Sequence, residues 1–436
     1  MTMTVILYAV LMPFLSALAP AAWLPLPLAL MILATPGLVL ARRLRALIAC
    51  WKRDIWFGLI FALGVFAIVG SPVPVGAKAL NYTFAVLVSY LFFFVMAREL
   101  LNGVSGSWDT ISRAAHASLT ILSIGVVIEF YLASWHGIFF TDLLPFAHDD
   151  LEIAFLLNED FRRPRAFSAE PGFTAVAYEC LWPLTWLGGA VVRRRMSWRV
   201  SQGLYAAAFM LLSSAAAIGC LAAASLVVWL VRSRDIKRFL RLVVPLAAVV
   251  STMLLAGWGE DLLWGVFGRK LGLFGAFEID GADAVTALVR LGRYGTGLDL
   301  LTEYPFGVGW GGVAQAFNDN MSIPGAEYID GSGLINLYLD LAVAAGVVSV
   351  PIMLVFFGIR WHGTLRSPHP AAAMVATALI SVCLHHLFIT EFQMPFLWFV
   401  LALADCLWLQ ERRERRPAKL MGSRPSAPVL KVGLQA

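Results

Sequence analysis

Long apolar runs recur through almost the whole of this 436-residue chain. Hydrophobic residues make up 60% of the sequence and charged residues 14%, against about 45–50% and about 25% in ordinary globular proteins. Soluble domains cannot bury so much apolar surface, so the surplus must face lipid. The sequence therefore predicts an all-α protein that crosses a membrane several times. It excludes a disulfide scaffold, a disordered chain and, because the formal net charge is only +5, a nucleic-acid-binding protein.

The apolar runs also predict the number of spans, because a bilayer core about 30 Å thick needs roughly 20 apolar residues per helix. Residues 203–231 are too long for one span and short for two, and we divide them near Ser213 and Ser214. That division keeps the basic cluster from Arg232 to Arg241 in the cytoplasm, where positively charged loops stay. About twelve transmembrane helices are thus expected in a single domain over residues 1–410. The other spans are expected at residues 4–19, 22–40, 55–73, 80–97, 117–135, 173–192, 239–257, 334–359, 371–389 and 395–410.

The distribution of basic residues predicts the orientation. A cluster in the 41–54 loop marks that loop as cytoplasmic, and alternation then places most of the 33 Lys and Arg residues inside. We expect both termini in the cytoplasm and a polytopic protein of the inner-membrane type. The first apolar run is interpreted as a transmembrane helix, since no Lys or Arg precedes it as in a signal peptide. The basic, proline-containing tail over residues 411–436 is expected to be disordered.

Two outward segments, at about 136–172 and about 258–332, are far longer than turns and are therefore expected to carry function. The first ends with Arg163 and Arg165 and then Glu170, directly before a span. Arginine suits phosphate because its planar fork donates two parallel hydrogen bonds. These arginines could hold a lipid-linked phosphate, or they could pair with acidic residues of the loop or touch lipid head groups. Glu170 is favoured as a cap of the following helix, with a general base as the alternative.

The second outward segment has a pair of arginines and a glycine-rich element. Arg290 and Arg293 are three residues apart and could share one helical face. Gly307 and Gly309 permit tight turns and a close approach of the backbone to a ligand, although a flexible connection is equally open. No Lys-Ser/Thr pair follows, so the element is not a nucleotide-binding loop.

The spans also contain ionisable residues, and such residues should face a cavity or a partner. His385 and His386 are expected to be packing residues, and the five cysteines to be buried apolar groups. Metal-ligand spacing is absent from the sequence, so we predict no metal site. The acidic residues concerned are Glu129, Glu179, Asp340 and Asp405.

Three motifs in these regions resemble those of the O-antigen polymerase and O-antigen ligase superfamily of bacterial membrane glycosyltransferases. They are Arg-Pro-Arg-Ala-Phe-Ser-Ala-Glu-Pro-Gly-Phe at 163–173, the arginine-to-Pro-x-Gly-x-Gly element at 293–309, and the Asn-containing start of a span at 335–346. Their order and spacing match the family from about residue 120 to residue 410. The ligases place a histidine directly before the asparagine of the last motif, whereas this chain has Ile335 before Asn336. The resemblance is therefore closer to the polymerases, in the exopolysaccharide branch.

This resemblance implies a membrane glycosyltransferase of the GT-C type in a bacterial inner (plasma) membrane, with short helices in its large extracytoplasmic loop. It implies joining of undecaprenyl-diphosphate-linked repeat units, with Arg163, Arg293 and Glu170 as catalytic residues. The substrate-binding residues implied are Arg165, Arg290, Gly307, Gly309 and Asn336.

The partners implied are undecaprenyl-diphosphate-linked glycans, membrane lipid and a chain-length-regulating membrane protein. Neither a metal nor a cofactor is required if arginines neutralise the diphosphates. The alternatives are an O-antigen ligase-type transferase and a transporter of lipid-linked sugars, although the spans show no repeat of two halves.

Overall fold

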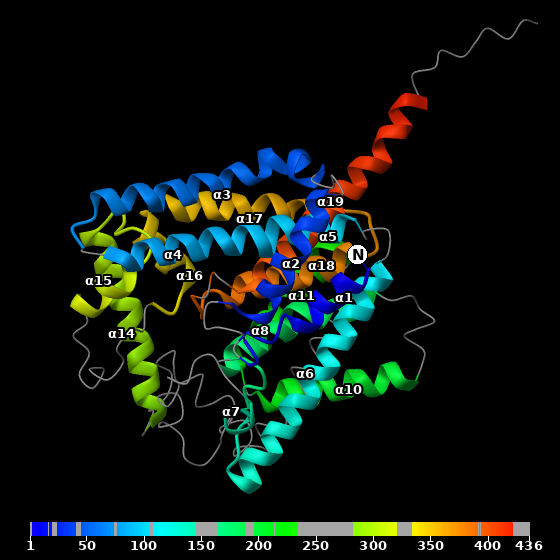
Figure 1. The fold of residues 1–436 in the computed structure, drawn as a ribbon, viewed down its shortest axis with the longest axis horizontal. Coiled ribbons are helices and arrows are strands. Elements are labelled where there is room, and N and C mark those ends of the chain that lie inside the picture. The colour runs from blue at the N-terminus through cyan, green and yellow to red at the C-terminus, as the bar shows by residue number, and fades with distance from the viewer. Residues whose placement is uncertain are drawn as a thin grey trace, which may run out of the picture.

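The computed structural model describes the greater part of the chain. Its described residues form helices and connecting segments, and no β-strand is found among them (Figure 1). Four of the helices are long and apolar enough to cross a membrane, at Ala46–Gly70, Ala79–Asn102, Trp108–His136 and Ala216–Ser233. The prediction of an all-α membrane protein is confirmed at this level. The described residues are 2–15, 17–19, 24–40, 45–73, 76–103, 108–144, 164–168, 170–187, 196–212, 214–233, 282–320, 334–390, 392 and 394–421.

The described helices form an N-terminal group that ends at Leu143 and a second group that begins at Pro171. The N-terminal part contains α1 (Thr2–Leu11), α2 (Leu26–Leu40), α3 (Arg45–Gly70), α4 (Gly76–Val88), the π-helix η1 (Ser89–Met96), α5 (Ala97–Asn102), α6 (Trp108–His136) and α7 (Phe140–Leu143). The remainder contains α8 (Pro171–Leu181), the 3₁₀-helix η3 (Pro183–Leu187), α10 (Met196–Leu211), α11 (Ala215–Ser233), α14 (Ala282–Glu303), α15 (Val313–Asn320), α16 (Leu337–Ala345), α17 (Ser349–Arg366), α18 (Ala372–His385) and α19 (Pro395–Met421).

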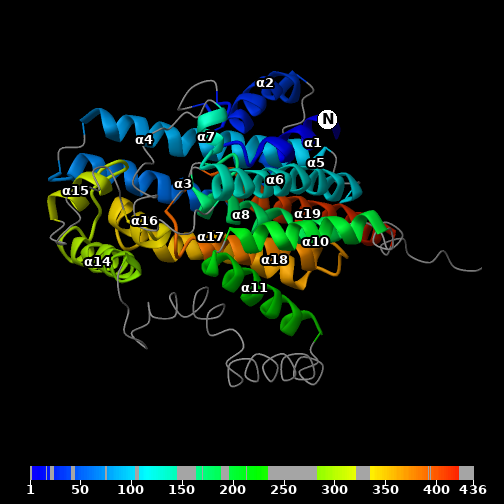
Figure 2. The ribbon, with the colours of Figure 1, turned by 90° about the horizontal axis from the view of Figure 1, so that it is seen from below.

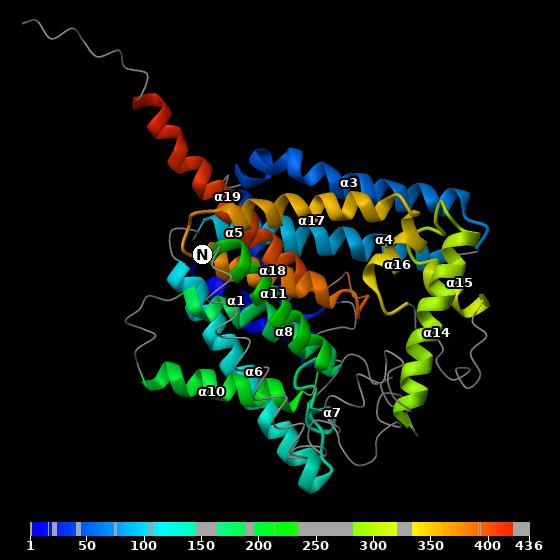
Figure 3. The same ribbon diagram turned by 180° about the vertical axis from the view of Figure 1, so that it is seen from behind.

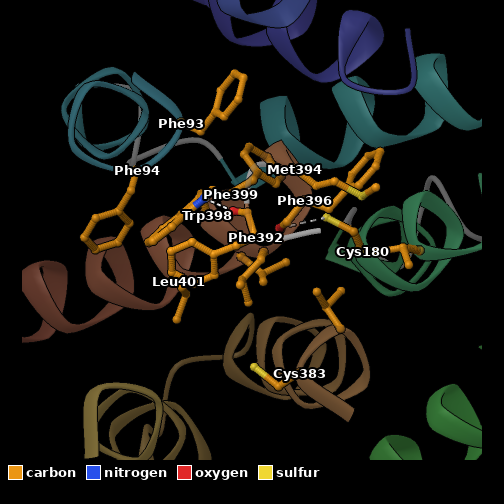
Figure 4. Close-up of a cluster of buried hydrophobic side chains, with 14 of the residues drawn as sticks. Phe93, Phe94, Cys180, Cys383, Phe392, Met394, Phe396, Trp398, Phe399 and Leu401 are labelled. Atoms are coloured by element: carbon orange, nitrogen blue, oxygen red, sulfur yellow. Dashed lines mark hydrogen bonds between the residues drawn. The ribbon is translucent and has the colours of Figure 1, made fainter. Parts of the chain in front are cut away.

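The first half of α19 forms the centre of the helix bundle. Its side chains from Phe396 to Leu403 are buried, and α5, η1, α8 and α18 pack around it. The close-up in Figure 4 shows Trp398 beside Phe392 and Phe94, and the Trp398 indole N–H donates to the Phe392 carbonyl at 2.8 Å. Further out, α3 packs against α17, α11 against α18, and α6 against α1 and α10 (Figures 1 and 2).

The structure confirms one predicted helix boundary and shifts several others, among them the start of α3, which lies at Arg45 within the predicted 41–54 loop. Three further differences concern the runs 334–359 and 4–19 and the C-terminal tail. Residues 203–231 do form two helices, since α10 ends at Leu211 and α11 begins at Ala215. The predicted run 334–359 is instead divided into α16 and α17 by Gly346, whose φ of 84° ends the first helix. In the first run, α1 stops at Leu11, two residues before Pro13, which has no N–H to donate and disfavours the helical conformation of the residue before it.

The third difference concerns the C-terminal tail. Helix α19 runs past Gln410 to Met421, so the segment predicted to be disordered begins as a helix. The predicted span 239–257 lies outside the described residues.

The second of the two long segments that the sequence analysis singled out contains α14 and α15. With 22 residues, α14 is longer than the short helices implied by the family resemblance. Figure 3 shows α14 and α15 at one end of the bundle, where both contact α16.

Five charged side chains meet where α3, α5, α17 and α19 come together. Arg98 on α5 binds Asp54 through two nitrogens, at 3.0 and 2.7 Å, and binds Asp405 at 2.9 Å. Arg360 on α17 binds Asp54 at 3.0 Å and Asp405 at 2.9 Å, and Arg53 Nε lies 3.0 Å from Asp405 Oδ1. All five are nine-tenths or more buried. The prediction that Asp405 faces a partner is confirmed, and we call this set the five-residue ion-pair network.

Candidate functional site

Arg293 lies half-buried on α14, and neighbouring contacts fix this helix at the end of the bundle. The hydroxyl of Tyr294 donates to the carbonyl of Leu387, just after α18, at 2.5 Å. One turn further on, a side chain at Gly297 would collide with Leu339 and Leu334, so the α14 backbone lies directly against the start of α16. The guanidinium of Arg293 is therefore carried by a helix with a defined position.

The same segment after α18 also holds the start of α16. The backbone N–H of Leu337 donates to the carbonyls of His386 and Ile389, at 2.9 and 3.1 Å. Asn336 caps the helix, since its side-chain oxygen accepts from the N–H groups of Tyr338 and Leu339 at 2.9 and 3.1 Å. The elements carrying Arg293 and Asn336 thus meet at one junction of α14, α16 and α18. The sequence did not predict the capping role of Asn336.

The glycine-rich element approaches another backbone closely, as its composition predicts, but that backbone is the protein's own. Gly307 and Gly309 have φ angles of 91° and 86°. The N–H of Gly309 donates to Ala344 on α16 at 2.8 Å, and a methyl group added at Gly309 would lie 2.7 Å from the Cα of Ile68 on α3. The element therefore joins the segment that contains α14 and α15 to α16 and α3 rather than acting as a flexible connection.

Glu129 on α6 holds the segment that contains Arg165. One of its carboxylate oxygens accepts the N–H groups of Arg165 and Ala166, at 2.8 and 2.5 Å, and the other accepts that of Phe140 at 3.4 Å. Ala166 has a φ of 50°, which is unfavourable for alanine and needs such support. The Arg165 side chain is only 4% exposed. The prediction that Glu129 faces a partner is confirmed, and the partner is a peptide backbone.

Glu170 occupies the N-cap position of α8 without capping through its side chain. Its backbone carbonyl accepts from the N–H groups of Phe173 and Thr174, at 3.2 and 3.4 Å, whereas its carboxylate makes no capping hydrogen bond and is exposed. Glu170 thus occupies the capping position that the sequence favoured, and the hydrogen bonds of the cap are made by its backbone carbonyl. An exposed carboxylate at this position is compatible with the alternative role of general base.

A buried carboxylate–imidazole pair joins α8 to α18. His385 Nδ1 lies 2.5 Å from Glu179 Oε1, and the Ser381 hydroxyl donates to Glu179 Oε2 at 2.8 Å. Both members of the pair are at most 2% exposed, so His385 is a partnered core residue as predicted. The sequence singled out each residue separately, but their wide separation along the chain gave no sign that they pair.

Two of the predicted site residues cannot be placed. Arg163 lies outside the described residues, and so does the side chain of Arg290, although its backbone belongs to α14. Among the described side chains, no group of three or more His, Cys, Asp or Glu residues could hold a metal ion.

Over its described residues the protein is helical, with four helices apolar enough to cross a membrane, and α14 and α15 are docked against α16 at one end of the bundle. No protein-family model matches the sequence, and no curated protein matches it significantly.

Proposed function

We propose that this protein is a polysaccharide polymerase that joins undecaprenyl-diphosphate-linked oligosaccharide repeat units at the outer face of a bacterial inner membrane. The observation that supports this most is the fixed position of Arg293, on a helix docked at the junction of α16 and α18. A lipid-linked diphosphate in the bilayer carries its negative charge at the membrane surface, where this end of the bundle would lie. The proposal includes about twelve spans, a GT-C-type architecture and cytoplasmic termini.

The proposed reaction is a displacement at the anomeric carbon of the growing chain. A hydroxyl of the incoming repeat unit attacks that carbon and forms the new glycosidic bond, while the bond to the diphosphate breaks. Undecaprenyl diphosphate leaves with the bonding electrons, and the acceptor hydroxyl loses its proton to a base. In this scheme Glu170 takes the proton, and a single displacement would invert the anomeric configuration.

The arginines would lower the barrier by stabilising the negative charge that develops on the leaving diphosphate. Arg163 and Arg293 are the principal candidates, with Arg165 and Arg290 binding the two diphosphates alongside them. Arginine suits this role since it stays charged and donates to two phosphate oxygens at once. Gly307, Gly309 and Asn336 would contribute by holding the outward segment against α16.

A strain that lacks the gene tests the type of reaction. We expect single repeat units to accumulate on undecaprenyl diphosphate and long surface chains to be missing, with the wild-type gene restoring the chains. Long chains that accumulate on the carrier would instead indicate a ligase. Repeat units trapped on the cytoplasmic side would indicate a transporter.

Arg293 variants in the same strain test the site. Loss of one charge-stabilising donor commonly costs a factor of about 10²–10³ in rate. We therefore expect Arg293→Gln to abolish long chains at normal membrane levels, and Arg293→Lys to retain part of the activity. Arg366→Gln is the matched control, because Arg366 is an exposed arginine in the last turn of α17. If Arg293→Gln had full activity, Arg293 would not be part of the site.

A further inference from the structure

The five-residue ion-pair network contains one more positive than negative charge. Three guanidinium groups, of Arg53, Arg98 and Arg360, share the carboxylates of Asp54 and Asp405. Leaving a charge uncompensated away from water is costly, so a buried cluster of this kind calls for a further anion.

The incompletely bound member is Arg53. Arg98 and Arg360 each bind through both terminal nitrogens, whereas Arg53 contacts Asp405 through Nε. The Nη2 of Arg53 is shielded from solvent, and the described structure gives it no hydrogen-bond partner. The side chain is only 9% exposed. Arg53 is thus the least completely bound arginine of the network, and the small exposed part of its side chain is where an additional anion could approach it.

A second arginine lies on the same aromatic ring. The guanidinium of Arg53 is 4.8 Å from the ring centroid of Trp408, and that of Arg412 is 5.3 Å from it. Of the acidic neighbours on α5 and α19, Glu99 accepts from the N–H groups at the start of α3. Glu411 lies 3.6 Å from Arg415 through Oε2, and its Oε1 has no hydrogen-bond partner in the described structure. Two guanidinium groups gathered on one ring repel each other, and an anion between them would relieve that repulsion.

The surroundings place Arg53 at the depth of lipid head groups. Trp51 and Lys52, its neighbours on α3, are exposed, and the Lys52 ammonium lies 5.7 Å from the Trp51 ring. Exposed tryptophan and lysine at the end of an apolar helix are typical of the membrane–water interface. The anion at this depth is therefore one that a lipid carries.

We propose that Arg53 and Arg412 bind the phosphate group of an anionic phospholipid, in the leaflet that borders this end of α3 and α19. The phosphate approaches Arg53 where its side chain is exposed and balances the extra charge of the network. Trp408 packs between the two arginines and the glycerol end of the lipid. This site is independent of the proposed polymerase activity.

Native mass spectrometry of the purified full-length protein in detergent, titrated with phosphatidylglycerol and with phosphatidylcholine, tests the site. We expect one phosphatidylglycerol to bind more tightly than phosphatidylcholine. Arg53→Lys keeps a positive charge near Asp405 but loses the planar guanidinium that can donate two hydrogen bonds to a phosphate. Arg412→Gln removes a charge beside Trp408 and leaves the five-residue ion-pair network unchanged. Each substitution should weaken phosphatidylglycerol binding about tenfold. Arg366→Gln, which removes an exposed arginine from α17, should bind as the wild type.

Three results would overturn the proposal. The first is wild-type phosphatidylglycerol affinity in Arg53→Lys, since Arg53 would then not contact the phosphate. The second is an equal loss in Arg366→Gln, which would show general attraction between basic surfaces and anionic lipid. The third is displacement of the lipid by millimolar inorganic phosphate, which would identify a free oxyanion as the ligand.

Discussion

A single buried carboxylate positions the backbone of the 164–168 segment. It belongs to Glu129, and one of its oxygens accepts two consecutive backbone N–H groups, from Arg165 and Ala166. A buried N–H group that loses its partner costs about 1–3 kcal/mol. Apolar contacts support the same turn, with the Phe167 ring stacked on Phe14 at a centroid distance of 4.2 Å.

Glu129→Leu should therefore destabilise the protein by several kcal/mol and lower polysaccharide synthesis per folded molecule. Glu129→Gln should be much milder, since the amide oxygen can still accept from Arg165 and Ala166 and only the weaker Phe140 contact is lost. Thermal unfolding in detergent and chain synthesis normalised to membrane level provide the two measurements.

Glu99 offers a matched control for this residue. It also accepts two backbone N–H groups, from Ala46 and Leu47, but at the start of α3. Glu99→Leu should reduce stability without reducing synthesis per folded molecule. Equal specific activity of Glu129→Leu and Glu99→Leu would show that the 164–168 segment has no part in the reaction.

At the scale of elements, the sequence predicted the presence of apolar helices better than the residues at which they begin and end. The division of residues 203–231 was predicted from the basic residues that follow this run, and their positions are visible in the sequence. The break between α16 and α17 could not be predicted in this way. It depends on Gly346 meeting the carbonyls of Pro305 and Phe306, at 3.1 and 2.9 Å from an added methyl group, and these residues are distant in sequence.

Gly309→Ala tests how the outward segment is docked. The substitution places a side chain against the backbone of Ile68 and forces alanine into a φ of 86°, so we expect a loss of more than about 2 kcal/mol in unfolding free energy. Gly295→Ala is the control. It lies within α14 with open space around it, and alanine there should stabilise the helix by about 0.5–1 kcal/mol. If Gly309→Ala had the same unfolding free energy in detergent as the wild type, the close contact between Gly309 and Ile68 would be contradicted.

The structure brings only some of the predicted site residues together, for a similar reason. Arg293 and Asn336 reach one junction because α14 and the start of α16 both contact the segment after α18. Glu170 lies where the motif predicts but caps only through its backbone. The Glu179–His385 pair and the partners of Glu129 arise from tertiary contacts that no local pattern encodes.

At the scale of the whole molecule, the five-residue ion-pair network joins segments from both ends of the chain. Hydropathy predicted that Asp405 would need a partner, yet its arginine partners come from three different helices. Removing one member of a buried ion pair costs about 3–5 kcal/mol, because the remaining charges stay buried.

We expect Asp405→Asn to lower the unfolding free energy by about that amount and to reduce the membrane level. Asp299→Asn, an exposed acid on α14, should have little effect. Thermal unfolding of both variants in the same detergent checks the difference. An Asp405→Asn protein as stable as Asp299→Asn would show that the network contributes little to the fold.

The central claim is that this chain alone elongates lipid-linked glycans. The direct measurement uses the purified protein in liposomes, supplied with undecaprenyl-diphosphate-linked single repeat units isolated from the deletion strain. The account predicts a ladder of longer lipid-linked chains, with one undecaprenyl diphosphate released for each bond formed and no ladder from Arg293→Gln. Repeat units that remain single in the presence of correctly folded wild-type protein would contradict it.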